Sequence, residues 1–166
     1  IDAGLACLCE PVAVCLRTAN MLPKQSDGRD VAIIGAGILG ITTAMILKNR
    51  SGYENVFVID RNEFKLEIIQ GLGLKSIHFN DVGAYENHFG YVIEASGALA
   101  TYHTSLKIAA SRATVVWMGN IQGDINFKKS EISSILRKEL IIRGTWNSDY
   151  QNGVRDDWGG ALNLIG

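Results

Sequence analysis

Three glycines and one aspartate carry the clearest chemical signal in this sequence. The glycines are spaced as Gly35-x-Gly37-x-x-Gly40; they follow the short apolar run Val31–Ile34 and precede an apolar segment of helical length. A second apolar run, Val56–Asp60, ends in an acid 20 positions after Gly40. This order of strand, glycine turn, helix, strand and acid is typical of a βαβ unit that binds a dinucleotide.

Each part of the glycine turn has a physical role in that interpretation. Gly35 permits the tight turn out of the strand, Gly37 lets backbone approach a pyrophosphate, and Gly40 lets the helix pack closely on the strand. The unpaired N–H groups where the helix begins favour a phosphate, so Ile38 and Leu39 are candidate binding residues as well. The alternative is an α/β turn that needs glycines only for its shape.

Asp60 and its neighbours bear on which dinucleotide would bind. A carboxylate at this position accepts hydrogen bonds from both hydroxyls of an adenosine ribose and repels a 2′-phosphate, which favours NAD over NADP. Arg61 could hold a 2′-phosphate, but Asp60 argues against that role. Lys65, at the start of the next predicted helix, could reach the same ribose, or it could be a solvated surface lysine.

The elements that must position these residues alternate regularly along the chain. Six strands between helices predict an α/β protein with a Rossmann fold, a doubly wound six-stranded parallel sheet in the order 3-2-1-4-5-6. We expect the strands at 31–34, 56–60, 75–79, 91–95, 113–118 and 139–145. Helices are expected at 10–22, 41–50, 62–72, 98–110 and 130–137, followed by a polar loop and a helix start near 156–161.

A ligand of such a sheet lies at the carboxyl ends of the strands. Residues that follow the fourth, fifth and sixth predicted strands are therefore further candidates for cofactor binding. Gly97 and Gly119 each end a strand, where a small residue would leave room for a ligand or simply terminate the strand. The candidates are Ser96, Gly97, Met118, Gly119, Asn120 and Trp146.

Composition excludes several other classes of protein. The 166 residues carry 16 basic and 17 acidic side chains, a net charge of −1, which offers no electrostatic basis for binding nucleic acid or an anionic membrane. No apolar run approaches the roughly 20 residues of a membrane span, and no signal peptide is recognisable. We expect a cytoplasmic protein in which Cys7, Cys9 and Cys15 are buried reduced thiols, since their spacing does not suit a metal site.

Residues for catalysis are harder to find. His78, His88 and His103 have no evident nucleophile or carboxylate partner in the sequence, so we interpret them as structural or solvent-facing. Motifs of serine hydrolases, zinc proteases and P-loop enzymes are absent. Hydride transfer needs a group that polarises a carbonyl as well as a cofactor, and the chain shows none in place.

Longer stretches of the chain resemble one known family. Their spacings are similar to those in the coenzyme domain of the zinc-dependent medium-chain alcohol dehydrogenase superfamily, nearest to the sorbitol and galactitol-1-phosphate (polyol) dehydrogenases. The glycine motif alone is generic, and the Glu10-Pro-Val-Ala-Val14 helix placed before it is more specific. The stretches are 10–14, 31–40, 58–60, 92–97, 115–119 and 140–144.

The resemblance implies that the chain is a fragment of a longer enzyme. Residues 1–22 would lead in from a missing catalytic domain, 23–150 would form the NAD-binding domain, and 151–166 would lead back. The intact enzyme would oxidise a secondary alcohol or polyol to a ketone with NAD, while this fragment alone would be inactive. The zinc ligands would lie in the missing domain, joined only by Glu10, whose alternative role is a helix N-cap.

The family also implies roles around the cofactor and at the sheet edge. Asp60, with Asn62 and Lys65, would bind the adenosine ribose, and backbone at 118–120 and 144–146 would line the nicotinamide. A homodimer could form through the edge of the sixth strand. Two alternatives remain: a stand-alone nucleotide-sensing module, as in the regulatory domains of potassium transporters, and a redox-inactive relative that kept the fold.

Overall fold

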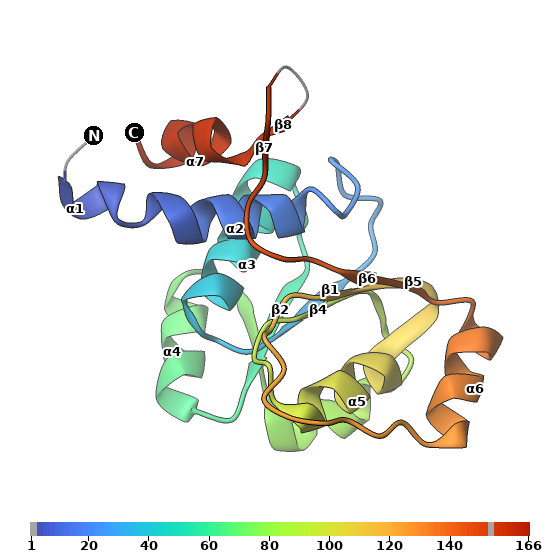
Figure 1. Ribbon diagram of the computed structural model, residues 1–166. Coiled ribbons are helices and arrows are strands. Elements are labelled where there is room, and N and C mark those ends of the chain that lie inside the picture. The colour runs from blue at the N-terminus through green and yellow to red at the C-terminus, as the bar shows by residue number, and fades with distance from the viewer. Residues whose placement is uncertain (1–2, 153–154) are drawn as a thin grey trace.

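A six-stranded parallel sheet forms the centre of the protein in the computed structural model, which describes residues 3–152 and 155–166 (Figure 1). The strand order is β3-β2-β1-β4-β5-β6, so the predicted Rossmann topology is confirmed. Residues 1–2 and 153–154, which belong to the two predicted terminal segments, lie outside the described residues. The strands are β1 (Val31–Ile34), β2 (Val56–Asp60), β3 (Lys75–His78), β4 (Phe89–Glu94), β5 (Ala109–Trp117) and β6 (Ile141–Gly144).

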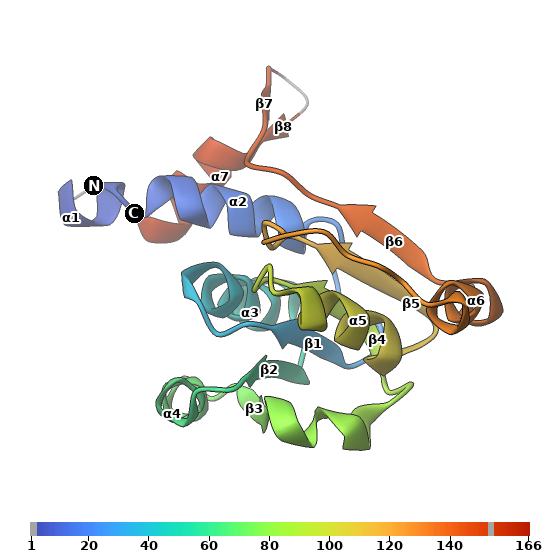
Figure 2. The ribbon, with the colours of Figure 1, turned by 60° about the horizontal axis from the view of Figure 1, so that its bottom comes forward.

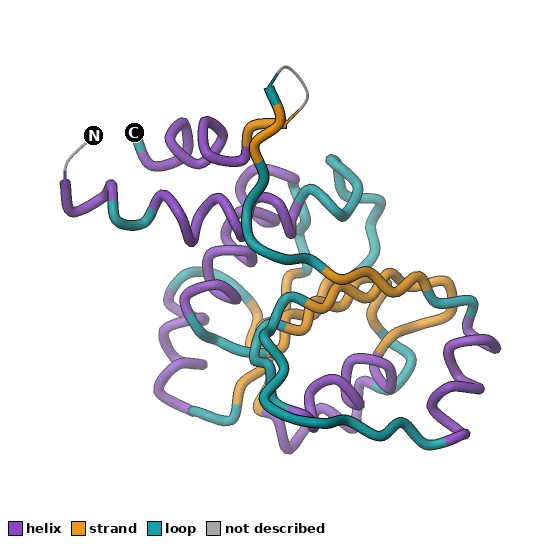
Figure 3. The backbone as a smooth tube through the Cα atoms, in the orientation of Figure 1, coloured by secondary structure: helices purple, strands orange, loops and turns teal. Residues whose placement is uncertain are grey.

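Helices connect successive strands and lie on both faces of the sheet (Figure 3). A short α1 and a longer α2 come before the first strand, and α7 follows the last. The helices are α1 (Ala3–Ala6), α2 (Cys9–Ala19), α3 (Ile38–Ser51), α4 (Glu63–Gly71), the 3₁₀ helix η1 (Phe79–Tyr85), α5 (Leu99–Ile108), α6 (Lys129–Lys138) and α7 (Asp157–Ile165).

Two apolar cores, one on each face, hold these layers together (Figure 2). Strand β1 is buried at all of its positions, and its side chains alternate between the faces. Val31 and Ile33 pack with residues of α2, α3 and α4, whereas Ala32 and Ile34 pack with residues of η1 and α5. The continuous apolar run in the sequence therefore reflects a central strand that is covered on both sides.

The boundaries of β5 differ from the prediction. It begins at Ala109 instead of 113, because Ala109 pairs with Phe89 at the start of β4 before the register shifts. Arg112, in the left-handed region with φ 61°, lies in this irregular stretch. Helix α5 consequently ends at Ile108, two residues before the predicted end.

The C-terminal segment is also more ordered than predicted. It forms a small antiparallel hairpin, β7 (Tyr150–Gln151) with β8 (Arg155–Asp156), and then α7. Helix α7 packs against α2, with Ala161 buried beside Val12 and Ala13 (Figure 1). The two ends of the described chain thus form one helical layer beside α3.

The three cysteines occupy different environments. Cys9 and Cys15 are buried as predicted, but Cys7 is exposed, so the prediction of a buried thiol there is wrong. Cys7 lies between α1 and α2, where its thiol donates to the carbonyl of Gly4 at 2.9 Å. No helix in the described part of the chain is long and apolar enough to cross a bilayer.

Candidate functional site

The glycine turn between β1 and α3 has the geometry that its spacing predicts. Gly35 has a φ of 112° and lies against Ala95 and Ser96, where an added Cβ would approach within 3.1 Å. A Cβ on Gly40 would lie 1.9 Å from the carbonyl oxygen of Gly35, so that residue must be glycine for the helix to pack. A Cβ on Gly37 would meet no atom within 4 Å. Only Gly37 therefore faces open space.

Helix α3 begins at that open position. Gly37 is its N-cap in an extended conformation, and no side chain caps the first N–H groups. Ile38, the first helical residue, is 61% exposed. Free N–H groups and the positive end of the helix dipole make this end of α3 suited to a phosphate.

Asp60, the last residue of β2, is tied directly to the glycine turn. Its Oδ2 accepts a hydrogen bond of 2.7 Å from the N–H of Ala36, and its Oδ1 accepts one of 2.9 Å from the N–H of Asn62. The ammonium of Lys65 lies 3.9 Å from Oδ2. These contacts fix the carboxylate beside the helix start, with its side chain still 13% exposed to solvent.

The neighbours of Asp60 have local roles of their own. Asn62 is the N-cap of α4 and accepts a hydrogen bond from the N–H of Lys65. Arg61 is exposed, and its carbonyl lies 3.1 Å from a ring nitrogen of His78 at the end of β3. Lys65 thus approaches Asp60, while the guanidinium of Arg61 remains on the surface.

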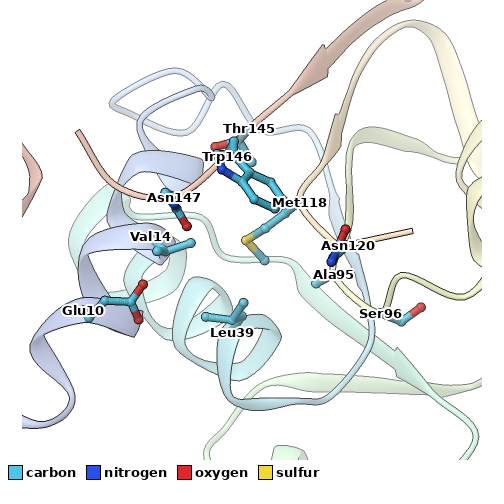
Figure 4. A pocket seen from close by; sticks show the side chains of 11 residues that line it. Glu10, Val14, Leu39, Ala95, Ser96, Met118, Asn120, Thr145, Trp146 and Asn147 are labelled. Carbon is cyan, nitrogen blue, oxygen red and sulfur yellow. The ribbon is translucent and has the colours of Figure 1, made fainter. Parts of the chain in front are cut away.

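A cavity of about 260 Å³ lies beside the turn, between α2, the carboxyl ends of β4 and β5, and the segment after β6 (Figure 4). It brings together seven predicted site residues: Glu10, Leu39, Ser96, Met118, Gly119, Asn120 and Trp146. Its other lining residues are Val14, Ala95, Thr145 and Asn147. The glycines of the turn, Ile38, Asp60, Arg61, Lys65 and Gly97 do not line it.

Glu10 and Val14 reach the cavity from the same face of α2, one turn apart (Figure 4). Glu10 lies in the first turn of the helix, whereas its N-cap is Leu8, so the alternative interpretation of Glu10 as an N-cap is wrong. The helical spacing of four residues that joins Val14 to Glu10 could have identified Val14 as a site residue.

Buried polar groups support the apolar side of the cavity. The hydroxyl of Thr18 donates to the sulfur of Met118 at 3.1 Å, and the thiol of Cys15 donates to the carbonyl of Leu39 at 3.3 Å. Burial raises the pKa of Cys15 to about 11, so this thiol stays protonated near neutral pH. The hydroxyl oxygen of Thr145 is buried in the cavity wall and has no hydrogen-bond partner among the described residues.

Gly97 and Gly119 do not simply leave room for a ligand. A Cβ on Gly97 would lie 2.2 Å from the carbonyl oxygen of Asn120, and a Cβ on Gly119 would lie 2.3 Å from the N–H nitrogen of Gly97. The turns after β4 and β5 therefore touch each other through these glycines. Their predicted contact with a cofactor is a separate matter and stays a prediction.

The histidines lie apart from this cavity. A ring nitrogen of His88 lies 2.9 Å from a carboxylate oxygen of Asp30, and His103 contacts Glu131. Both carboxylate partners are distant in sequence, so sequence analysis missed them. None of the three histidines lines the cavity.

Comparison with known proteins identifies the family. The family model described as zinc-binding dehydrogenase matches residues 39–166. The chain belongs to the zinc-binding dehydrogenase family. This zinc-binding dehydrogenase chain is 26% identical to galactitol 1-phosphate 5-dehydrogenase of Escherichia coli K12, over 94% of the chain and 47% of that enzyme. It is 29% identical to L-threonine 3-dehydrogenase of Shewanella woodyi, over 90% of the chain and 45% of that enzyme.

A solved structure agrees with these relatives. Galactitol-1-phosphate dehydrogenase from Escherichia coli superposes on this chain with a TM-score of 0.81 at 23% identity, covering 95% of the chain and 48% of that protein. The resemblance to zinc-dependent polyol dehydrogenases is thereby confirmed. The chain spans about half the length of the relatives it matches.

The described residues of this dehydrogenase chain do not form a zinc site. No group of three or more histidine, cysteine, aspartate or glutamate side chains comes together in residues 3–152 and 155–166. The buried thiols of Cys9 and Cys15 face main-chain carbonyls. Glu10 alone does not make a zinc site, because zinc in proteins takes at least three protein ligands.

Proposed function

We propose that this chain is the NAD-binding part of a dehydrogenase that oxidises a secondary alcohol or polyol to a ketone. NAD, when bound, supplies the hydride acceptor, and this chain supplies the binding surface. One observation carries the proposal: Asp60 is hydrogen-bonded to Ala36 inside the glycine turn, beside the open N-terminus of α3. The carboxylate proposed to bind the ribose is thus in direct contact with the turn proposed to bind the phosphate.

The remaining groups fit the same ligand. A dinucleotide that places its pyrophosphate at Gly37 and its adenosine ribose at Asp60 can extend its nicotinamide half toward the cavity between Leu39, Met118 and Trp146. Asp60 repels a 2′-phosphate, so we propose NAD as the preferred cofactor over NADP. The partly exposed Asp60 and Lys65 remain free to share hydrogen bonds with ribose hydroxyls.

We further propose that this chain is one part of a longer protein. In it, residues 1–22 and 151–166 would connect the dinucleotide-binding part to a catalytic domain that holds the zinc, and Glu10 would reach the metal or its water from the rim of the cavity. The protein would act in the cytoplasm, and a homodimer could form through the edge of β6. The matches to zinc-binding dehydrogenases favour this function over a stand-alone nucleotide sensor.

Titration of the chain with NADH and NADPH, followed by nucleotide fluorescence, tests the proposal. Gly37→Ala is the informative variant, because the added methyl meets no protein atom and would enter the space for the pyrophosphate. We expect the unmodified chain to bind NADH more tightly than NADPH, and Gly37→Ala to weaken NADH binding about tenfold or more. Its thermal stability should not fall.

Gly71→Ala is the matched control, since a Cβ there also meets nothing within 4 Å and the residue lies at the end of α4, outside the candidate site. It should bind NADH like the unmodified chain. Absence of NADH binding by the unmodified chain, or unchanged binding by Gly37→Ala, would contradict the proposed site.

A further inference from the structure

Glu94, the last residue of β4, is a carboxylate buried beneath the candidate site. Glu94 is 0% exposed, like the apolar residues Val92 and Ile93 that precede it in the strand, although its side chain is a carboxylate. Burying a carboxylate costs free energy that an apolar side chain would not cost, and replacement of buried charges by apolar groups is often neutral or stabilising. A role beyond packing is therefore expected for this residue.

One carboxylate oxygen holds the turn that follows β4. Oε1 lies 2.8 Å and 2.9 Å from the donating N–H nitrogens of Ser96 and Gly97. It also lies 2.8 Å from the hydroxyl of Ser96 and 2.7 Å from the hydroxyl of Thr101 in α5. A single oxygen atom thus ties the strand, the turn and the first turn of the next helix together.

The other side of Glu94 faces the turn that follows β5. Oε2 has no hydrogen-bond partner among the described residues and lies where a Cβ on Gly119 would come within 2.4 Å. The main-chain carbonyl of Glu94 accepts hydrogen bonds from the N–H groups of Met118 and Gly119, both at 2.9 Å. Tyr102 closes the arrangement by donating to the carbonyl of Gly119 at 2.6 Å.

Both turns supply the wall of the cavity, through Ser96 on one and Met118, Gly119 and Asn120 on the other. They touch at Gly97 and Gly119 with no room for a side chain between them. The position of each turn therefore depends on the other, and Glu94 contacts both.

We propose that Glu94 is a positioning residue of the dinucleotide site, which holds the turns after β4 and β5 at the spacing that binds the nicotinamide half. The inference rests on the proposed function, because it assigns the two turns to a nucleotide. Position rather than charge is the property that matters. Oε1 must stay within hydrogen-bond distance of the N–H groups of Ser96 and Gly97. The group in the place of Oε2 must be small enough to fit beside Gly119.

Two substitutions separate position from charge. Glu94→Gln keeps the length of the side chain and, through its amide oxygen, the acceptor for Ser96 and Gly97, but removes the charge. Glu94→Asp keeps the charge but is shorter by one methylene, so it withdraws the oxygen from the turn. We expect Glu94→Gln to bind NADH within about threefold of the unmodified chain, and Glu94→Asp to bind about tenfold more weakly or worse.

A second readout does not depend on nucleotide. Hydrogen exchange at the N–H groups of Ser96 and Gly97 should become faster in Glu94→Asp and stay nearly unchanged in Glu94→Gln. Glu131→Asp is the control, since Glu131 also accepts a backbone N–H, from Lys128, but lies outside the cavity. If Glu94→Asp does not fold, Thr101→Val removes one donor of the set, with faster exchange and about threefold weaker binding expected.

The outcomes distinguish this inference from the proposed function. No NADH binding by the unmodified chain would contradict the proposed function. The exchange rates would still show whether Glu94 holds the turn after β4. Binding and exchange in Glu94→Asp that match the unmodified chain would overturn the inference. So would a larger loss in Glu94→Gln than in Glu94→Asp, because charge would then be the decisive property.

Discussion

At the scale of single residues, the site is defined by side chains that are missing as much as by those that are present. Gly40 and Gly119 lack a Cβ because backbone or a buried carboxylate occupies its place, whereas Gly37 lacks one beside open space. The motif predicts Gly37 and Gly40 alike, and Gly119 lies outside it; of the three, Gly37 is the one that leaves open space for a ligand. Substitution at each position should therefore have a different consequence.

Asp60 is the residue that should select between the two nicotinamide dinucleotides. Its carboxylate repels a 2′-phosphate, while Arg61 and Lys65 lie beside it and would attract one. Asp60→Ala should therefore shift the ratio of NADPH to NADH affinity toward NADPH by about tenfold. Binding titrations with both nucleotides measure this ratio; an unchanged ratio would exclude Asp60 from the ribose site.

How much of the site is predictable at this scale depends on how local the signal is. The glycine turn and Asp60 are recognised because short spacings define them. Glu94 was missed because a single acid in an apolar strand also fits an exposed strand end, and its donors become visible only when the turn is folded. The carboxylate partners of His88 and His103 lie on other elements, so no short spacing reveals them.

At the scale of elements, a lysine of helix α6 caps the C-terminal end of helix α5. The ammonium of Lys138, in the last turn of α6, donates to the carbonyls of Leu106, Lys107 and Ala109 at 2.9, 3.2 and 2.9 Å. These carbonyls end α5 and begin β5, where the helix no longer supplies N–H partners; the carbonyl of Lys107 also accepts from the N–H of Asn87. This long-range cap stabilises the end of α5, where Ala109 leaves the helix to pair with Phe89.

Removal of that cap should destabilise the fold. Lys138→Met removes the ammonium that donates to these three carbonyls, and we expect it to lower the free energy of unfolding by about 2 kcal/mol. Urea denaturation measures the change, with Lys129→Met as the control, since Lys129 is an exposed lysine in the first turn of the same helix. Equal stability of the two variants would show that the cap contributes nothing.

Most elements, though not all their ends, follow from the sequence. Apolar runs such as Val31–Ile34 identify the central strands β1 and β4, which are buried on both faces. The extended start of β5 depends on the pairing of Ala109 with Phe89, which is distant along the chain. The short strands β7 and β8 pair Tyr150 with Asp156 without an alternating apolar pattern to mark them. Such pairings have no local signature.

At the scale of the whole molecule, polar networks close the end of the sheet opposite the candidate site. Asp27 accepts hydrogen bonds from Tyr91 at 2.7 Å and from Arg29 at 2.8 Å, which join the connector before β1 to β4. Arg29 also lies over the Tyr91 ring, 4.3 Å from its centre. Burial alone would raise the pKa of Asp27, but the hydrogen bonds from Tyr91 and Arg29 outweigh it and lower the pKa.

This network should make stability depend on pH in acid. Because the pKa of Asp27 is lower in the folded protein, its contribution is present above the unfolded pKa, near 3.8, and is lost as the pH falls through the folded value. Asp27→Asn should cost roughly 0.5–1 kcal/mol at about pH 7, a small effect because the side chain is 39% exposed. The cost should shrink as the pH falls below 3.8 in urea titrations. A loss of stability in Asp27→Asn that does not depend on pH would show that packing, not the charge of Asp27, causes it.

The position of β1 at the centre of the sheet has a consequence for how the chain reaches its fold. Val31 pairs with Val56 of β2 on one side and with Tyr91 of β4 on the other. One edge of β1 therefore remains unpaired until β4 forms. A nascent or refolding chain that has completed only β1 to β3 therefore exposes a fully apolar strand edge, which is a template for association with another chain. Refolding yield should thus fall as protein concentration rises, and closure of β1 on β4 is the step that ends this vulnerability.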